Sequence, residues 1–320
     1  MQLKQAFFAS PGPQTKRDAL VLAIKGVCMG VADIIPGVSG GTIAFITGIY
    51  EDLIAAIKSF DLTFFKRVLT LQFASALSEV HLRFLVSLLC GIGIAVVAMS
   101  RVMHYLMQAY PVAVWSFFFG LIGASIVVVG GKIGKLDVVR LLALLIGAVA
   151  GFIIVGMIPV YTPETLGFIF FSGALAICAM ILPGISGAFI LLLLGKYEFI
   201  TGALKHPFNG ENGLIILVFV AGCVLGIMGF SRLLNYFLKH HHSATLAVLT
   251  GFMIGSLRKI WPFKEVLETT VIRNKVYVLR EQNILPGSME DALMAAGLIV
   301  VGFCAVYFLE RRMAKPGNAI

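Results

Sequence analysis

Apolar runs long enough to cross a lipid bilayer recur along almost the whole of this chain. Six of them form two groups of three, at residues 84–108, 112–130, 139–159, 214–238, 243–257 and 291–309. A helix needs about 20 apolar residues to cross the hydrocarbon core. Hydrophobic residues make up 59% of the sequence and charged residues 13%, unlike a soluble domain. Because the runs are continuous and do not alternate, they predict a polytopic α-helical membrane protein and not a β-barrel.

Two further apolar stretches, one before each group of three, are interrupted by a Pro-Gly pair. The pairs are Pro36-Gly37 and Pro183-Gly184. Proline removes a helix hydrogen bond and glycine lets the chain turn, so each stretch predicts two short half-helices. The arms at residues 19–35 and 43–57 are short for a full crossing, which favours a re-entrant hairpin. Two full but strained crossings are the alternative.

The two halves of the chain repeat one another. Residues 35–41 (Ile-Pro-Gly-Val-Ser-Gly-Gly) correspond to residues 182–188 (Leu-Pro-Gly-Ile-Ser-Gly-Ala), 147 positions later, and Arg101 corresponds to Arg232, 131 positions later. Each half then holds one hairpin and three crossings, and an odd number of crossings makes the second half enter from the opposite face. The predicted fold is an all-α polytopic membrane protein of two inverted repeats, each a re-entrant helical hairpin plus three transmembrane helices. This arrangement is typical of alternating-access transporters.

The loops between these units give the predicted boundaries. We predict an N-terminal cytoplasmic segment (1–17), a first repeat (18–160) with its tip at 36–41, a second repeat (161–310) with its tip at 183–188 and an external loop at 259–290, and a C-terminal cytoplasmic tail (311–320). Short-loop Lys and Arg residues favour the side of the N-terminus, which places both termini in the cytoplasm, with Lys196 among the basic residues of the outer side. Residues 269–279 predict a small hairpin, and residues 62–82 an amphipathic interfacial helix.

The net charge of +9 is spread over short loops, which indicates membrane orientation and contact with anionic lipids and argues against nucleic acid. The five cysteines lie in apolar segments without ligand-like spacing. The run His240-His241-His242 is expected to be a solvated or headgroup-facing turn, with metal binding as the alternative. We therefore predict no metal site and no cofactor.

The predicted tips carry the features of an anion site. A half-helix that begins near Pro-Gly directs unpaired N–H groups and its positive dipole end toward the membrane midplane. Glycines allow a phosphate to approach the backbone, and hydroxyls add donors. The tip residues predicted to bind an anion are Gly37, Ser39, Gly40, Gly41, Thr42, Gly184, Ser186 and Gly187. The alternative is a pair of helix-breaking turns capped by serine.

Ionisable residues also lie within the apolar segments. Arg101 and Arg232 sit past the middle of their helices, where an arginine needs a partner, and a phosphate would be one. Snorkelling or pairing with a glutamate is the alternative. Asp33, Glu51 and Glu198 are candidates for proton binding during transport, or else cap and pair at an interface. The tyrosines at positions 50 and 197 are predicted to be interfacial anchors.

The tip sequences, Asp33-Ile-Ile-Pro-Gly-Val-Ser-Gly-Gly-Thr42 and Leu182-Pro-Gly-Ile-Ser-Gly187, and the Tyr-Glu pairs after them resemble the bacterial undecaprenyl phosphate (polyprenyl phosphate) translocases. This family was long catalogued only as a domain of unknown function, and the resemblance covers about residues 18–309. The second tip departs from the first, with Met180 opposite Asp33 and Ala188 opposite Gly41.

The resemblance implies that the chain returns undecaprenyl phosphate from the outer to the inner leaflet of the bacterial inner (plasma) membrane for lipid-carrier recycling. Ser39, Gly40, Ser186 and Gly187 would then touch the phosphate, and Arg101 and Arg232 would neutralise it. Coupling to the proton-motive force is also implied, with Glu51 or Glu198 as candidates. The expected partners are undecaprenyl phosphate, membrane lipids and protons, and a homo-oligomer is compatible with the sequence.

Other functions fit parts of the pattern. Gly-x-Ser-Gly occurs in rhomboid-type proteases, but the histidines here fall at loops or membrane edges, away from either serine. A lipid phosphatase with Ser100-Arg101 would need histidine at position 107, which is Met107. We therefore expect no enzyme. A secondary transporter of a small soluble anion is the stronger alternative, because helix-tip anion sites do not by themselves reveal a lipid tail.

Overall fold

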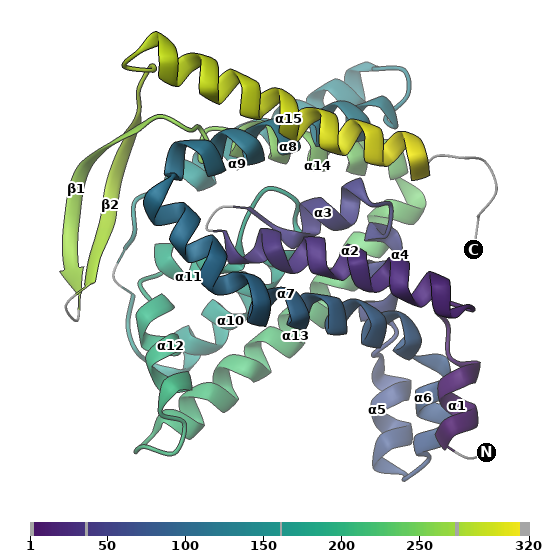
Figure 1. Cartoon of the computed structure of the whole chain (residues 1–320). Coiled ribbons are helices and arrows are strands. Elements are labelled where there is room, and N and C mark those ends of the chain that lie inside the picture. Colours follow the sequence, from purple (N-terminus) through teal and green to yellow (C-terminus); the bar gives the residue numbers. More distant parts are fainter. Residues whose placement is uncertain (1–2, 36–37, 161, 273–274, 314–320) are drawn as a thin grey trace.

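The computed structural model describes residues 3–35, 38–160, 162–272 and 275–313, and within them it is helical apart from one β-hairpin (Figure 1). Pro36 and Gly37 of the first predicted tip, the boundary at residue 161 and the end of the predicted tail lie outside these residues. The first half contains α1 (Leu3–Ala9), α2 (Lys16–Ile34), α3 (Gly40–Ile46), α4 (Tyr50–Lys58), α5 (Leu62–Leu69), α6 (Phe73–Glu79), α7 (Leu82–Ala109), α8 (Pro111–Gly131) and α9 (Val138–Gly156). The second half contains α10 (Leu166–Ile181), α11 (Gly187–Leu193), α12 (Tyr197–Lys205), α13 (Asn212–His240), α14 (His242–Ser256), β1 (Lys264–Ile272), β2 (Lys275–Asn283) and α15 (Met289–Met313).

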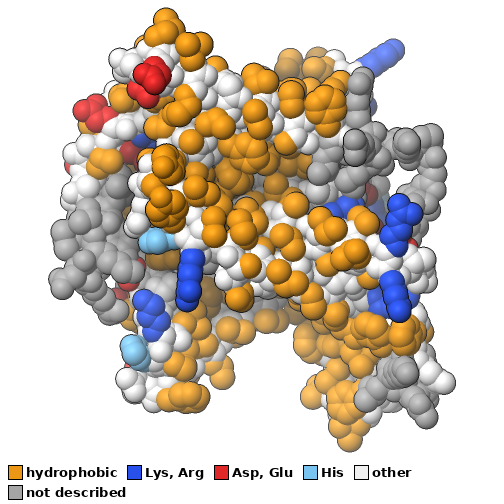
Figure 2. Space-filling view, in the orientation of Figure 1, with side chains coloured by type: hydrophobic (Ala, Val, Ile, Leu, Met, Phe, Trp, Pro, Cys, Tyr) orange, Lys and Arg blue, Asp and Glu red, His pale blue; other side chains and the backbone are white. Residues whose placement is uncertain are grey.

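Five described helices, α7, α8, α9, α13 and α15, are long and apolar enough to cross a membrane, or up to seven spans if each bent helix pair is one. Hydrophobic side chains cover the middle of the face in Figure 2, and most of its Lys and Arg side chains lie toward the edges. The prediction of a multi-pass helical membrane protein is therefore confirmed. The remaining predicted span, at residues 243–257, is α14, whose 15 residues rise only about 22 Å. That is shorter than the hydrocarbon core of a typical bilayer.

Each predicted hairpin contains one more break than the sequence indicated. The return arm of the first hairpin is divided into α3 and α4, bent by 119°, and that of the second into α11 and α12, bent by 111°. Gly48 (φ +70°) and Gly195 (φ +64°) lie at the two bends. Glycine adopts these left-handed angles without steric cost. The prediction of a single half-helix over residues 43–57 was therefore wrong, because a second glycine turn follows the Pro-Gly turn.

Equivalent helices of the two halves make equivalent contacts. Helix α2 packs along α7 as α10 packs along α13, and α9 packs on α14 as α15 packs on α8 (Figure 1). The closest approaches repeat as well: a Cβ on Gly91 would lie 2.0 Å from the Ala23 carbonyl oxygen, and one on Gly222 would lie 2.0 Å from that of Phe170. The packing therefore repeats between the halves. The last helix of each half, α9 or α15, packs on a helix of the other half. Their inverted orientation across a membrane stays a prediction.

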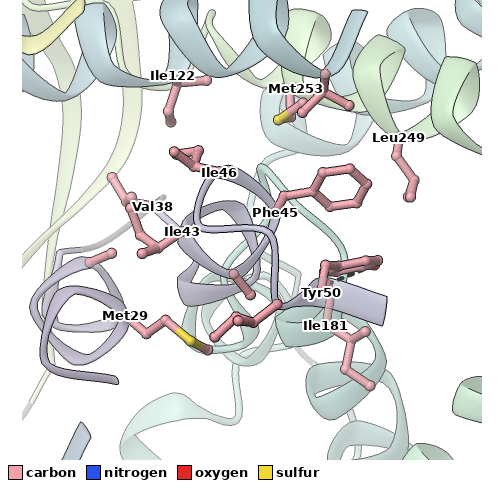
Figure 3. Close-up of a cluster of buried hydrophobic side chains, with 14 of the residues drawn as sticks. Met29, Val38, Ile43, Phe45, Ile46, Tyr50, Ile122, Ile181, Leu249 and Met253 are labelled. Carbon is pink, nitrogen blue, oxygen red and sulfur yellow. Dashed lines mark hydrogen bonds between the residues drawn. The ribbon is translucent and has the colours of Figure 1, made fainter. Parts of the chain in front are cut away.

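The buried core is centred on α3. All seven residues of this helix are buried, and the Phe45 ring packs against the Tyr50 ring with centroids 4.3 Å apart. Ile122 from α8 and Leu249 and Met253 from α14 lie around the same cluster (Figure 3). The short helix that follows the first tip is therefore enclosed by elements of both halves.

The segment predicted as one interfacial helix at residues 62–82 is two short helices, so that prediction was wrong. Leu71 between α5 and α6 has φ +59°, which ends the helical path. Arg67 forms an ion pair with Glu79, which joins the two helices. Helix α1 packs against α6.

The predicted external loop does contain a β-hairpin, longer than the one expected at 269–279. Strands β1 and β2 pair antiparallel from Lys264↔Asn283 to Ile272↔Lys275. At its base the Glu281 carboxylate accepts hydrogen bonds from Lys259 (2.8 Å) and Lys264 (3.1 Å). Burial alone would raise the pKa of Glu281, but the two ammonium groups hold that pKa below its usual value.

We predict that Gly91→Ala and Gly222→Ala each lower the free energy of unfolding by about 1–3 kcal/mol, because the new Cβ would meet backbone of the packed neighbour. Gly93→Ala is the matched control on α7, since a Cβ there meets nothing within 4 Å. Thermal unfolding in detergent measures the difference. Equal midpoints for Gly91→Ala and Gly93→Ala would contradict the close crossing of α2 and α7.

We also predict that Glu281→Gln destabilises the protein at pH 7 by about 1–3 kcal/mol, the scale of hydrogen bonds to a charged group. The folded-state pKa of Glu281 lies below its ordinary value of 4.5, so the stabilisation is present above that pH and is lost as the pH falls through the folded-state pKa. Unfolding midpoints of the wild type and Glu281→Gln should therefore converge at low pH. The exposed Glu265→Gln is the control, and a constant difference down to pH of about 3 would refute the ion-pair explanation.

Candidate functional site at the paired hairpin tips

The two predicted tips lie against each other in the interior. The Thr42 hydroxyl accepts a hydrogen bond from the Gly184 backbone N–H at 3.0 Å. The Ser39 hydroxyl donates to the Met180 carbonyl at 3.1 Å, with the Leu182 carbonyl at 3.3 Å. Both hydroxyl side chains are fully buried. Segments about 140 residues apart in the chain therefore form one polar junction.

This junction supplies partners to the open end of α10. The last carbonyls of a helix have no partner within it, and Pro183 prevents the helix from continuing. Ser39 provides a donor for the carbonyl of Met180, and the Tyr50 hydroxyl donates to the carbonyl of Ile181 at 3.2 Å. A Cβ on Gly41 would lie 2.6 Å from that same Ile181 oxygen, so glycine permits the close approach. The first tip thus caps the incoming helix of the second hairpin.

The Tyr50 contact corrects one prediction and reveals a residue that the sequence did not single out for the site. Tyr50 was expected to be an interfacial anchor, but it is 2% exposed and lies beside Phe45 and Ile181 (Figure 3). Its position directly after the Gly48 bend turns the side chain inward. A tyrosine after a short apolar helix is common at interfaces, so the pattern alone did not distinguish the two locations.

The start of α3 is already satisfied by side chains of the first hairpin. Ser39 is the N-cap residue and accepts from the Gly41 N–H at 3.1 Å. Asp33 accepts from the Gly40 N–H at 2.7 Å. A Cβ on Gly40 would lie 2.5 Å from the Asp33 carboxylate, which explains the glycine. A negatively charged group therefore already occupies the place where an anion would meet this helix end.

The start of α11 differs from that of α3. Met180 stands where the first half has Asp33, and among the described residues no carboxylate accepts from the Gly187 N–H. Within the described residues, the Ser186 hydroxyl makes no hydrogen bond, although the side chain is only 7% exposed. A Cβ on Gly187 would lie 2.6 Å from the Ala176 carbonyl oxygen, so the helix start is tightly packed. The two tips are thus chemically unequal, and the second one keeps a free hydroxyl.

The two predicted arginines lie on long helices beside the hairpins. Arg232 is half-buried on α13 and donates to the carbonyls of Met228 (2.7 Å) and Phe60 (3.4 Å), the latter just after α4. Arg101 is exposed on α7. It lies six residues after Ala95, where Gly30 of α2 packs closely against α7. Among the described residues, no hydrogen bond or ion pair joins either arginine to a tip. Their role in anion binding stays a prediction.

The three predicted proton-binding carboxylates occupy different surroundings. Asp33 is partly buried at the junction. Glu51 is exposed at the start of α4 and lies 3.0 Å from His242 Nε2. Glu198 is partly exposed in the first turn of α12, one helix beyond the tip helix α11. Of the three carboxylates, Asp33 is the one for which the structure describes a hydrogen bond to the backbone of a tip.

Two lysines that were not assigned to the site donate hydrogen bonds to backbone carbonyls in or next to the hairpins. Lys25 Nζ donates to the Thr47 carbonyl at 2.8 Å, at the end of α3. Lys196 Nζ donates to the Thr162 carbonyl at 2.6 Å. Lys196 was counted among the loop charges of the outer side, but it is 1% exposed. A lysine inside an apolar stretch was the signal available in the sequence.

Comparisons with known proteins agree with this architecture. The family model described as undecaprenyl phosphate translocase-like matches residues 29–277. A polyprenyl-phosphate transporter of Vibrio cholerae is 39% identical over 300 residues, which cover 91% of this chain and 96% of that protein. A polyprenyl-phosphate transporter of Staphylococcus aureus is 33% identical over 254 residues, which cover 75% and 85%. No solved structure matches the chain. Since the family match spans both hairpin tips and most of the sequence, this chain belongs to the undecaprenyl phosphate translocase-like family.

Proposed function

We propose that this chain moves undecaprenyl phosphate from the outer to the inner leaflet of the bacterial plasma membrane, by alternating access coupled to the proton-motive force. Both termini then lie in the cytoplasm. The observation that carries the proposal is the hydrogen-bonded junction of the two broken-helix tips. Irregular backbone at membrane depth is tolerated where it is enclosed by protein or lines a pathway, and transporters place their substrates at such breaks. The names of the two relatives support the choice of lipid substrate.

The phosphate headgroup first meets the second tip in this proposal. Ser186, beside Gly187, offers a free hydroxyl, and separation of the tips also frees the Gly184 N–H that now bonds to Thr42. At the first tip, the Ser39 hydroxyl donates and the Thr42 hydroxyl accepts in the tip-to-tip hydrogen bonds. Separation of the tips during the transport cycle frees Ser39, Gly40, Gly41 and Thr42 to contact the phosphate. The charge of the headgroup is balanced by Arg101 and Arg232, one on each half.

Asp33 supplies the proposed link to protons. Its carboxylate holds the Gly40 N–H that an anion would otherwise bind. Two negative groups at one helix end repel, so binding of phosphate at the first tip favours the protonated form of Asp33. A proton would then travel with the anion, and Glu51 and Glu198 are candidates for passing it to either side. This arrangement makes inward transport responsive to the proton gradient.

We predict that Ser186→Ala and Arg232→Ala each weaken the binding of undecaprenyl phosphate about tenfold or more, since each removes a hydrogen bond to a charged group. Native mass spectrometry of the purified protein measures the binding, with undecaprenol as the ligand that lacks phosphate. Ser75→Ala, an exposed serine on α6, is the matched control.

Equal binding of the alcohol and the phosphate would exclude the proposed phosphate site. If instead inorganic phosphate competes at equal concentration, the protein is a transporter of a small soluble anion. A leaflet-flip assay in proteoliposomes then tests whether bound lipid is moved and in which direction.

We further predict that undecaprenyl phosphate binds the wild type more weakly as the pH rises, because the ionised Asp33 competes with the headgroup. Asp33→Asn removes the charge and should make binding nearly independent of pH. Glu51→Gln and Glu198→Gln, measured in parallel, identify which carboxylate carries the dependence. Transport by Asp33→Asn that still responds fully to an imposed proton gradient would remove Asp33 from the coupling mechanism.

A further inference from the structure

A cavity of about 490 Å³ lies at the base of the β-hairpin, apart from the tip junction. Its walls come from the end of α9, the turn after α14 and the end of β2. The residues that matter for its chemistry are Gly156, Arg258, Lys259, Glu281 and Asn283. The cavity is therefore polar and is built by elements of both halves.

Two cations, Arg258 and Lys259, line this cavity beside the Glu281 carboxylate, and a third, Lys264, reaches the same carboxylate from outside the lining. Lys259 and Lys264 both donate to Glu281. Within the described residues, no carboxylate pairs with Arg258, so its guanidinium donors are available to a ligand. Three positive charges against one negative charge leave a local excess of two, which favours an anion. Arginine is also well suited to bind phosphate oxygens in pairs.

Aromatic rings hold each of these cations in place. The Arg258 guanidinium lies over the Phe152 ring at 4.4 Å, and Lys264 Nζ lies over the Trp115 ring at 4.4 Å. Lys259 Nζ lies 5.0 Å from the ring of Phe189 on α11. Such stacking orders flexible cationic side chains before a ligand arrives. The cluster is therefore a preformed site, unlike freely moving surface lysines.

An apolar groove of about 300 Å³ follows the seam of α9 and α14, one turn before the cavity on the same two helices. It is lined by Ala148, Val149, Phe152, Ile254 and Gly255. A Cβ on Gly255 would lie 2.3 Å from the Ala148 carbonyl oxygen, so the helices touch along the floor of the groove. The Val149 side chain is 58% exposed, and the apolar span of α9 is only 17% buried. The groove therefore opens toward surrounding lipid.

Phe152 connects the cavity and the groove, because it lines the groove and the Arg258 guanidinium of the cavity stacks on its ring. An anionic head beside a long apolar tail matches this pair of spaces. Residues of the cavity and its neighbours also contact the second hairpin. Lys259 contacts Phe189 of α11, and Gly184 packs against Ser256, two residues before Arg258.

We propose that this cavity and groove form a docking site for undecaprenyl phosphate, with the phosphate on Arg258 and Lys259 and the first isoprene units along α9 and α14. The inference rests on the proposed function and adds a second lipid-binding position to it. In the predicted topology the hairpin loop is external, so the site collects the lipid from the outer leaflet. The headgroup then passes along α11 to Ser186 at the second tip.

The test uses the full-length protein in nanodiscs and a photoreactive polyprenyl phosphate whose reactive group lies in the first isoprene units. In the wild type we expect cross-links to peptides of α9 and α14. The double variant Arg258→Ala/Lys259→Ala should lose these cross-links and bind undecaprenyl phosphate at least about tenfold more weakly. Val149→Trp, which fills the groove, should lose the cross-links but keep its affinity for inorganic phosphate. Lys205→Ala and Val97→Trp, an exposed lysine and an 83% exposed valine elsewhere, are the matched controls.

The outcomes separate this site from the transport function. If the wild type cross-links only at the tips and the double variant transports at the wild-type rate, the docking site is refuted and the transporter remains. If inorganic phosphate prevents cross-linking as well as the lipid does, and Val149→Trp has no effect, the cavity binds soluble anions and the lipid proposal is wrong. If the wild type neither binds nor moves undecaprenyl phosphate, the proposed function fails first and the docking site falls with it. Because Lys259→Ala also removes a hydrogen bond to Glu281, the double variant is expected to unfold at a lower temperature than the wild type. A cooperative unfolding transition well above the assay temperature shows that each variant is folded.

Discussion

Broken helices in an apolar interior must find partners for the backbone groups that each break exposes, and the fold of this protein depends on how that is done. An unsatisfied buried group costs about 1–3 kcal/mol, and more where no water reaches it. Ser39, Thr42 and Tyr50 of the first half supply partners for Met180, Gly184 and Ile181 of the second half. Neither hairpin tip is therefore complete alone, and the two halves are joined at their least regular segments.

The junction is also where the two halves stop being equivalent. The first tip carries its own anion, Asp33, while the second has Met180 and an unengaged Ser186 hydroxyl. A strictly symmetric pair would present the same surface to both sides of the membrane. Here one half combines a titratable carboxylate with hydroxyls that already bind the opposite tip, and the other offers the free hydroxyl of Ser186. In the proposed function, this difference gives the two tips separate roles, one in binding and one in coupling.

Packing around the junction connects it to the β-hairpin. Helix α14 contributes to the core around α3, contacts the second tip through Ser256 and lines the groove beside α9. Because α9 and α14 belong to different halves and touch at Gly147, Gly251 and Gly255, a movement of one half against the other must alter this seam. The cation cluster at Arg258 lies at the end of the same seam. In the proposed docking site, a lipid headgroup at this cluster would therefore contact the same seam that packs on the second tip.

Much of the fold could be predicted from the sequence because apolar length, Pro-Gly breaks and internal repetition are local signals. They predicted the spans, the two tips and the external β-hairpin. They missed the bends at Gly48 and Gly195 and the break at Leu71, since a glycine or leucine in an apolar stretch has no unique backbone meaning. The burial of Tyr50 and Lys196 and the separate places of Arg101 and Arg232 depend on how distant segments meet. The Asp33–Gly40 hydrogen bond joins residues seven apart and depends on how the start of α3 meets the end of α2. The sequence by itself determined a repeated membrane-embedded chain with broken helices. Only the tertiary structure decided which donors are engaged and which are free, because the hydrogen-bond partners are contributed by segments about 140 residues apart.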